Sequence, residues 1–207
     1  MEVDIQSLET FNQLASEGAQ QATAMLAQMT GIQAEVEVTK ITLMDRADVG
    51  EELAGQAFVG IGFDLEGALV GDTTLVFEEA CTGPIVEALP GGAAGEEMVE
   101  SSVKEIGNIM MSGFIDGWAN VLETSVDHTP PRVVHDMGRA IIDPLAAQVG
   151  QQQEHAFIIE SRMQTADLEF GCEIHALPDD AELRQALGDL DVTRKDQTEP
   201  DVETIFE

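Results

Sequence analysis

Basic residues are scarce in this chain of 207 residues, which has 9 lysines and arginines against 40 acidic residues. The formal net charge is −31 at pH 7, and the acidic residues are spread along nearly the whole sequence. Nucleic acids and anionic membranes present phosphates that such a surface would repel. The charge balance therefore excludes both as expected partners.

Long apolar runs are also missing from the sequence. No stretch approaches the roughly 20 apolar residues that a membrane span needs. The first residues, MEVDIQSLETF, lack the basic segment and the apolar core of a secretory signal. We therefore expect a cytoplasmic protein without a membrane anchor.

Cysteine and histidine show no metal-binding pattern. Cys81 and Cys172 are far apart and form no CxxC motif, so neither a zinc cluster nor a disulfide framework is predicted. The 4 histidines show neither HExxH nor any other ligand spacing. We expect two buried free thiols and no metal site.

The apolar content is nevertheless that of a folded protein. Hydrophobic residues make up 43% of the chain, which rules out a wholly disordered one. At ordinary salt the acidic surface would repel itself, whereas at molar salt the Debye length falls to about 3 Å and the repulsion is largely screened. This composition predicts adaptation to a very salty cytoplasm. The alternative, an acidic ligand-binding surface, would cluster the charge in one region.

Hydrophobic periodicity predicts the same order of elements twice. Residues 1–95 begin with a helix over 8–30, followed by strands over 32–44, 56–65 and 67–77 and a helical segment over 78–89. After a linker over 90–95, residues 96–190 contain a helix over 96–123, an extended segment over 125–137, strands over 155–163 and 166–177, and a helix over 179–190. Residues 191–207 are predicted to be an acidic, disordered tail.

The two long helices carry matching apolar stripes. Aligning Phe11 with Val103 superimposes the first stripe on the second. The first comprises Phe11, Leu14, Gly18, Ala22, Met25 and Met29, and the second comprises Val103, Ile106, Met110, Phe114, Gly117 and Val121. The match predicts an internal duplication. We expect one α+β domain over residues 1–190, with halves 1–95 and 96–190 related by a pseudo-twofold axis. A mainly antiparallel sheet would be flanked by two long helices on one surface.

The stretch ESSVKEIGNIMMSGF (100–114) carries polar residues on an otherwise apolar helix. Glu105, Asn108 and Ser112 share the side opposite the apolar stripe, and residues three apart on a helix have Cβ atoms roughly 5–6 Å apart. One partner surface can therefore touch both Glu105 and Asn108. An ordinary solvated face would show the same pattern.

Three further residues of this helix bear on contacts with the sheet or with a partner. Met111 lies between the stripe and the polar side and is a candidate contact for a partner. Gly107 and Gly113 each cost about 1 kcal/mol of helix stability relative to alanine. They fit either close packing of the helix against the sheet or room for a partner's loop to approach Asn108.

The segment KEIGNIMMSGFIDGWANVL (104–122) closely resembles the second helix motif of CheC-type chemotaxis proteins, relatives of CheX and FliY. The resemblance continues in TPPRVVHDM (129–137) and GAQQATAMLAQM (18–29) and covers nearly all of the chain except the tail. In that family an E-x-x-N pair on each of two related helices enters the active site of the phosphorylated response regulator CheY. The resemblance therefore implies a CheY phosphatase whose catalytic pair is Glu105 and Asn108.

Each residue of the pair has a role that the resemblance implies. Asn108 would hold a water in line with the breaking P–O bond, because its carboxamide is both donor and acceptor. Glu105 would pair with an active-site lysine of the regulator and fix its register. The protein would need no cofactor of its own, since these regulators carry their own Mg²⁺. A further partner implied by the resemblance is the receptor deamidase CheD.

The first helix departs from the family pattern. The alignment of the two helices places Gln13 opposite Glu105 and Ser16 opposite Asn108. One turn earlier, Glu9 and Asn12 restore the E-x-x-N spacing, although Asn12 is rotated away from the matching direction. A slipped working site is one interpretation, and a degenerate second site is the one we favour.

The sequence thus leaves two functional classes open. One is a CheC-like phosphatase acting on a CheY-type response regulator. The other is a chemotaxis adaptor without turnover, which binds CheD or the regulator, and the degenerate first helix favours it. A motility-switch component of the FliY kind would normally carry an added SpoA-like domain.

Overall fold

The computed structural model describes residues 5–31, 33–45, 57–87, 96–138, 140–141, 155–166, 169–179, 181–182 and 185. The predicted linker over 90–95, most of the helix over 179–190 and the tail over 191–207 lie outside the described residues. Asp179 accepts backbone hydrogen bonds from Ala181 and Glu182 at 2.9 and 3.2 Å, as expected of the residue that caps that helix.

The helices and strands follow the predicted order. The first half contains α1 (Ile5–Thr30), β1 (Glu35–Asp45), β2 (Ala57–Gly67), β3 (Gly71–Glu78), the short 3-10 helix η2 (Glu79–Cys81) and α3 (Thr82–Glu87). The second half contains α4 (Glu96–Val121), β4 (Val126–His128), β5 (Arg132–Met137), β6 (His155–Gln164) and β7 (Glu169–Pro178).

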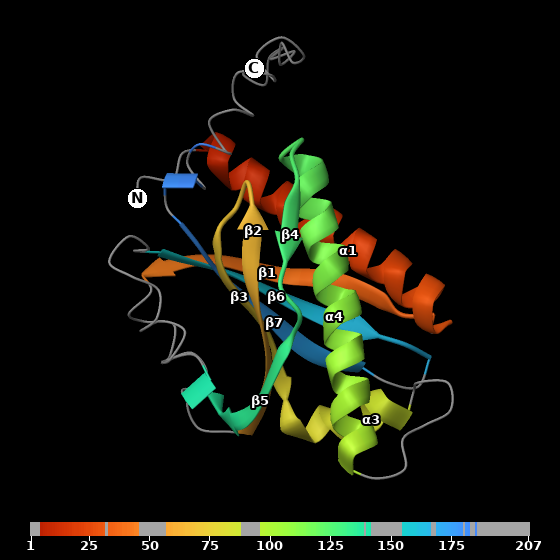
Figure 1. The fold of residues 1–207 in the computed structure, drawn as a ribbon. Coiled ribbons are helices and arrows are strands. Elements are labelled where there is room, and N and C mark those ends of the chain that lie inside the picture. Colours follow the sequence, from red (N-terminus) through yellow and green to blue (C-terminus); the bar gives the residue numbers. More distant parts are fainter. Residues whose placement is uncertain are drawn as a thin grey trace, which may run out of the picture.

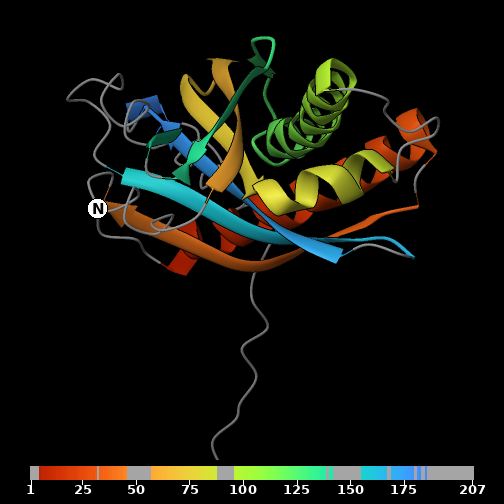
Figure 2. The same ribbon diagram turned by 90° about the horizontal axis from the view of Figure 1, so that it is seen from below.

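All recorded strand pairs are antiparallel and belong to one sheet of seven strands (Figure 1). The spatial order is β1-β6-β7-β3-β2-β4, and β5 also pairs with β2. Figure 2 shows the strong twist of this sheet, with β1 and β6 inclined to β2 and β3. The predicted α+β class with a mainly antiparallel sheet is confirmed.

The strand order reads the same from either edge when β1, β2 and β3 are matched with β4–β5, β6 and β7. Its centre falls between β3 and β7, the last strand of each half. Such an order is expected from two related halves that share one sheet, while the duplication itself stays a prediction.

The extended segment predicted over 125–137 is two strands rather than one. β4 pairs with residues 65–67 of β2, and β5 pairs with residues 57–62 of the same strand. Thr129, Pro130 and Pro131 lie between them, and a proline has no N–H to donate to a sheet. The break leaves these residues at the edge of the sheet, beside α4.

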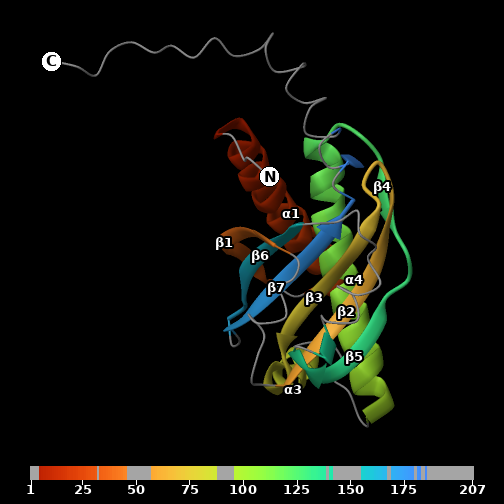
Figure 3. The ribbon, with the colours of Figure 1, turned by 90° about the vertical axis from the view of Figure 1, so that its left-hand side faces the viewer.

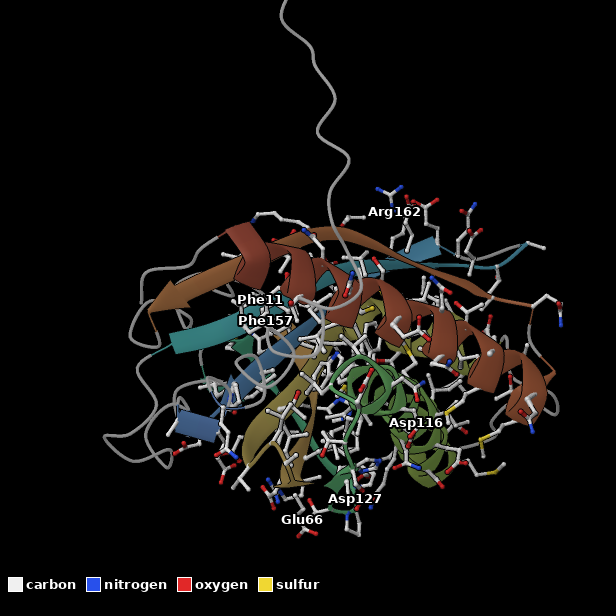
Figure 4. All side chains as sticks on the ribbon, turned by 90° about the horizontal axis from the view of Figure 1, so that it is seen from above. Phe11, Glu66, Asp116, Asp127, Phe157 and Arg162 are labelled. Atoms are coloured by element: carbon white, nitrogen blue, oxygen red, sulfur yellow. The ribbon has the colours of Figure 1, made fainter. Side chains whose placement is uncertain are left out.

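Both long helices lie on one face of the sheet, as predicted, and they cross each other (Figures 1 and 3). The opposite face of β2 is also covered, because Ile141 lies against Gly60. In the predicted stripes most residues are buried; Met25 and Val121 are half-buried, and Met29, near the end of α1, is exposed. Phe11 of α1 packs against Phe157 of β6, with ring centroids 4.6 Å apart (Figure 4).

Glycines permit the close approach of α4 to its neighbours. A Cβ at Gly107 would collide with the side chain of Ile61 on β2, so this glycine packs against the sheet, in line with the first of its two interpretations. A Cβ at Gly113 would collide with the backbone of Ala22, so Gly113 faces α1 rather than the sheet. Both glycines are buried, and neither leaves room for a partner's loop.

The two cysteines are free, but only one is buried. Cys172 lies in the core, where burial raises the pKa of its thiol to about 12. Cys81 is half-buried, contrary to the expectation, because η2 lies at the surface; partial burial still raises its pKa. No helix among the described residues is long and apolar enough to cross a membrane.

Candidate functional site

Helix α4 presents Glu105 and Asn108 away from the core. Glu105 is exposed and Asn108 is half-buried, while Ile106 and Ile109 beside them are buried. This alternation follows from the helical period, which returns to the same face after three or four residues. Within the described part of the chain, no hydrogen bond or ion pair is recorded for either the Glu105 carboxylate or the Asn108 amide.

Met111 does not share this exposed face. Its side chain is 0% exposed and belongs to the hydrophobic core, so the prediction that it contacts a partner is wrong. The reason is that α4 packs against both the sheet and α1, which widens its buried arc beyond one stripe. A helical-wheel projection of the sequence shows one apolar stripe, and it does not show that a second side of the helix is also covered.

Glu105 and Asn108 line an open groove of about 450 Å³ between α4 and the segment after β4. Ser101 and Lys104 complete the helix side of the groove. The opposite wall, called here the proline wall, consists of His128, Thr129, Pro130 and Pro131. The groove thus brings residues of α4 together with residues some 20 positions or more later in the sequence.

His128 fastens the proline wall to α4. Its Nδ1 lies 2.9 Å from the Thr129 carbonyl, which can only accept, so Nδ1 carries the proton. In the neutral ring Nε2 is then an acceptor, and the Ser112 hydroxyl donates to it at 3.0 Å. The imidazole also packs edge-on against the Phe63 ring, with ring centroids 5.1 Å apart. Ser112, predicted on the polar side of the helix, thus positions the wall.

Asp64 of β2 holds the other end of the wall. Arg132 donates two hydrogen bonds to its carboxylate, at 2.6 and 2.8 Å. The Thr129 hydroxyl donates to the same carboxylate at 3.3 Å and accepts from the Asp64 backbone N–H at 2.9 Å. The Thr129 backbone N–H donates to the Asp64 carbonyl at 2.9 Å. The Arg132 guanidinium holds the pKa of Asp64 below its ordinary value of 3.8. Such bidentate pairing fixes geometry as well as charge.

Asp72 of β3 stands directly across from Asp64 in the sheet. Burial, together with the neighbouring Asp64 carboxylate, raises the pKa of Asp72 above its ordinary value of 3.8. A raised folded-state pKa means that the charged form of Asp72 opposes folding at neutral pH. Like charges directly across a sheet act in the same direction.

We expect Asp72→Asn to increase the free energy of unfolding at pH 7 in molar KCl. The gain should shrink as the pH falls through the raised pKa of Asp72, and it should vanish below the ordinary value of 3.8, where both states bind the proton. Denaturant titrations at several pH values measure this. Asp116→Asn, on the exposed face of α4, removes the same charge and is the control for a general change in net charge. Destabilisation by Asp72→Asn at pH 7 would contradict the prediction.

Three of the four first-helix candidates have side chains that the structure describes. Asn12 and Ser16 are exposed and Gln13 is half-buried, all on α1; the side chain of Glu9 lies outside the described residues. Where α4 has the proline wall, α1 has β1, and the backbone N–H of Val36 donates to the Thr23 hydroxyl at 2.9 Å. A degenerate second site at Glu9, Asn12, Gln13 and Ser16 stays a prediction.

The sequence alone did not predict the proline wall or the hydrogen bonds that hold it against α4 and β2. Nothing in the spacing of His128, Asp64 and Arg132 links them, because strand pairing alone brings β2 to residues 126–137. The Pro130–Pro131 pair was the available signal, since two prolines at a sheet edge mark a break beside the helix. Among the described residues no group of three or more histidine, cysteine or acidic side chains is placed to hold a metal ion.

The α+β domain thus displays an E-x-x-N pair beside an open groove. The CheC-like family is matched over residues 98–135, which span most of α4, β4, the proline wall and most of β5. A curated protein of Halobacterium salinarum, named "Putative CheY-P phosphatase CheC1", is 31% identical over 186 residues, covering 86% of this chain and 92% of that protein. The chain belongs to the CheC-like family.

Solved structures share this fold at low sequence identity. FliY of Thermotoga maritima superimposes with a TM-score of 0.75 at 17% identity, covering 94% of this chain and 100% of that one. The FliM middle domain of H. pylori gives a TM-score of 0.64 at 12% identity, covering 90% and 99%. The relative from Halobacterium also fits the salt adaptation that the composition predicts.

Proposed function

We propose that this protein hydrolyses the aspartyl phosphate of a phosphorylated CheY-type response regulator in the chemotaxis pathway of the cytoplasm. The observation that carries the proposal is the half-exposed Asn108 amide, which lines an open groove beside Glu105 on α4. Membership of the CheC-like family and the name of the Halobacterium relative support the same activity.

Asn108 is the proposed catalytic residue. Its amide oxygen accepts a hydrogen bond from a water and its NH₂ group donates one, so the amide can orient that water at phosphorus. The water oxygen forms a bond to phosphorus while the bond from phosphorus to the regulator's aspartate oxygen breaks. The aspartate leaves as a carboxylate, and both hydrogens of the water end on inorganic phosphate. Positioning supplies most of the catalysis in such a transfer.

Glu105 is the proposed docking residue. A second carboxylate beside a phosphoryl group would be repelled, so Glu105 is suited to meet a cation of the regulator rather than to act as a base. The exposed carboxylate has no recorded ion pair within the described residues and needs no internal contact to break before docking. Mg²⁺, which neutralises the phosphoryl group, would arrive with the regulator.

Glu105→Gln is expected to weaken binding of the phosphorylated regulator by at least about tenfold, because the partner's cation then loses its counter-charge inside the interface. Titration of a labelled regulator in molar KCl measures the loss. Glu35→Gln, on β1 at the opposite edge of the sheet, is the matched control and should leave affinity unchanged. Equal affinities for the two variants would rule out a docking role for Glu105.

The activity itself is tested by timing the decay of the phosphorylated regulator with and without this protein in molar KCl. A shortened lifetime is the expected result. An unchanged lifetime together with tight binding would instead support the adaptor function, which the substitutions at Gln13 and Ser16 on α1 favour. Binding of CheD, away from the groove, belongs to either function and is tested by co-elution of the two purified proteins.

A further inference from the structure

Basic residues are rare in this protein. Most of the basic side chains that the structure describes form ion pairs with acidic residues of the same chain. Of the 9 lysines and arginines, the structure describes the side chains of Lys40, Lys104, Arg132 and Arg162. Lys40 pairs with Glu160 at 2.6 Å, Arg132 with Asp64 at 2.6 Å and Arg162 with Glu169 at 3.2 Å. Among the described residues, Lys104 is the remaining cation, and no ion pair is recorded for it.

This unpaired cation lines the candidate groove. Lys104 is exposed and lies one helical turn before Asn108, so their Cβ atoms are roughly 6 Å apart. Its flexible stem of four methylene groups allows the ammonium to extend over the groove toward the amide of Asn108. Glu105 is the next residue of α4, yet the ammonium is not recorded in an ion pair with it.

We propose that Lys104 binds a phosphoryl oxygen of the regulator's aspartyl phosphate while Asn108 orients the water. The inference rests on the proposed function and adds an anion-binding residue to the same groove. Phosphoryl oxygens are the densest negative charge that would approach Asn108, and a lysine ammonium binds them as a compact point charge with three donors. The contact would also offset repulsion between Glu105 and the phosphoryl group.

A contact of this kind has to act at short range. In a molecule with a net charge of −31, a single lysine cannot attract an anion from a distance. At molar salt the Debye length is about 3 Å, so any effect of Lys104 that survives there reflects direct contact. A general change in net charge is screened at molar salt and would not produce such an effect.

The test measures binding of phosphorylated and unphosphorylated regulator to three variants in molar KCl. Lys104→Gln should weaken binding of the phosphorylated form by about tenfold and leave the unphosphorylated form nearly unchanged, because only the former has the phosphoryl oxygens. Lys104→Arg should keep most of the affinity for the phosphorylated form. Lys40→Gln, which removes the same charge at the opposite sheet edge, should match the wild type.

Three outcomes would overturn the inference. Wild-type affinity of Lys104→Gln would show that the ammonium makes no contact. Equal losses for both forms of the regulator would assign Lys104 to a carboxylate of the partner instead. A wild-type protein that binds both forms equally would leave no phosphoryl recognition to explain. Failure of the proposed function is distinguishable, because it appears as an unchanged lifetime of the phosphorylated regulator with the wild-type protein.

Discussion

Asn108→Ala is expected to slow dephosphorylation of the regulator by about 10²-fold or more, the effect typical of removing a group that orients the reacting atoms. Binding should change little, because the half-buried amide contributes a small part of the groove and Glu105 remains in place. Single-turnover decay of the phosphorylated regulator measures the rate, and a parallel titration measures affinity. A rate loss without an affinity loss is the signature of an interaction made in the transition state.

Asn120→Ala provides the matched control for this experiment. Asn120 is exposed on the same helix, and about three turns of α4 separate it from Asn108. Its replacement should leave both rate and affinity at wild-type values. Full turnover by Asn108→Ala would contradict the assignment. In that case Asn12 on α1 would be the residue to replace next, because the first helix would have to supply the water-positioning amide.

Gly117→Ala is expected to lower the free energy of unfolding by about 3 kcal/mol, which corresponds to overpacking of a rigid contact. On an exposed helix this change would stabilise the protein, because alanine is the better helix former. Here a Cβ at Gly117 would collide with the backbone of Gly18, where α4 crosses α1. Backbone atoms cannot rotate out of the way as a side-chain terminus can, so the two helices must move apart.

Gly171→Ala is the control for this second prediction. A Cβ at Gly171 on β7 would meet no atom within 4 Å, and the residue is exposed. Its replacement should stabilise the protein by roughly 0.5–1 kcal/mol, because glycine in a strand costs conformational entropy. Denaturant unfolding of both variants in molar KCl gives the two free energies. A stability of Gly117→Ala equal to or above that of the wild type would show that the crossing is not tightly packed.

The tight crossing also serves the candidate site. Gly113 and Gly117 place the backbone of α4 directly against α1, and Gly107 places it against Ile61 of β2. With three close contacts along one helix, α4 has little freedom to rotate about its axis. Asn108 therefore faces the proline wall in a defined direction, as precise positioning of a catalytic group requires.

The sequence by itself determined the helices, the strands and the spacing of the candidate site residues within one helix. The apolar period of α1 and α4, the strand alternation and the E-x-x-N spacing are properties of neighbouring residues, so they could be predicted from the chain alone. The side of α4 that carries Glu105 and Asn108 followed from the same period. Family resemblance supplied the expected chemistry of that pair.

Only the tertiary structure decided what stands opposite the pair. The hydrogen bonds of Asp64 with Thr129 and Arg132 join residues distant in sequence. They form because β4 and β5 both pair with β2. Burial of Met111 likewise depends on how α4 packs: Met111 lies one turn after Gly107, on the side of the helix that faces Ile61 of β2, whereas Gly113 and Gly117 face α1. Contacts of this kind arise when elements pack together, and the period of one helix carries no information about how many neighbours will cover it.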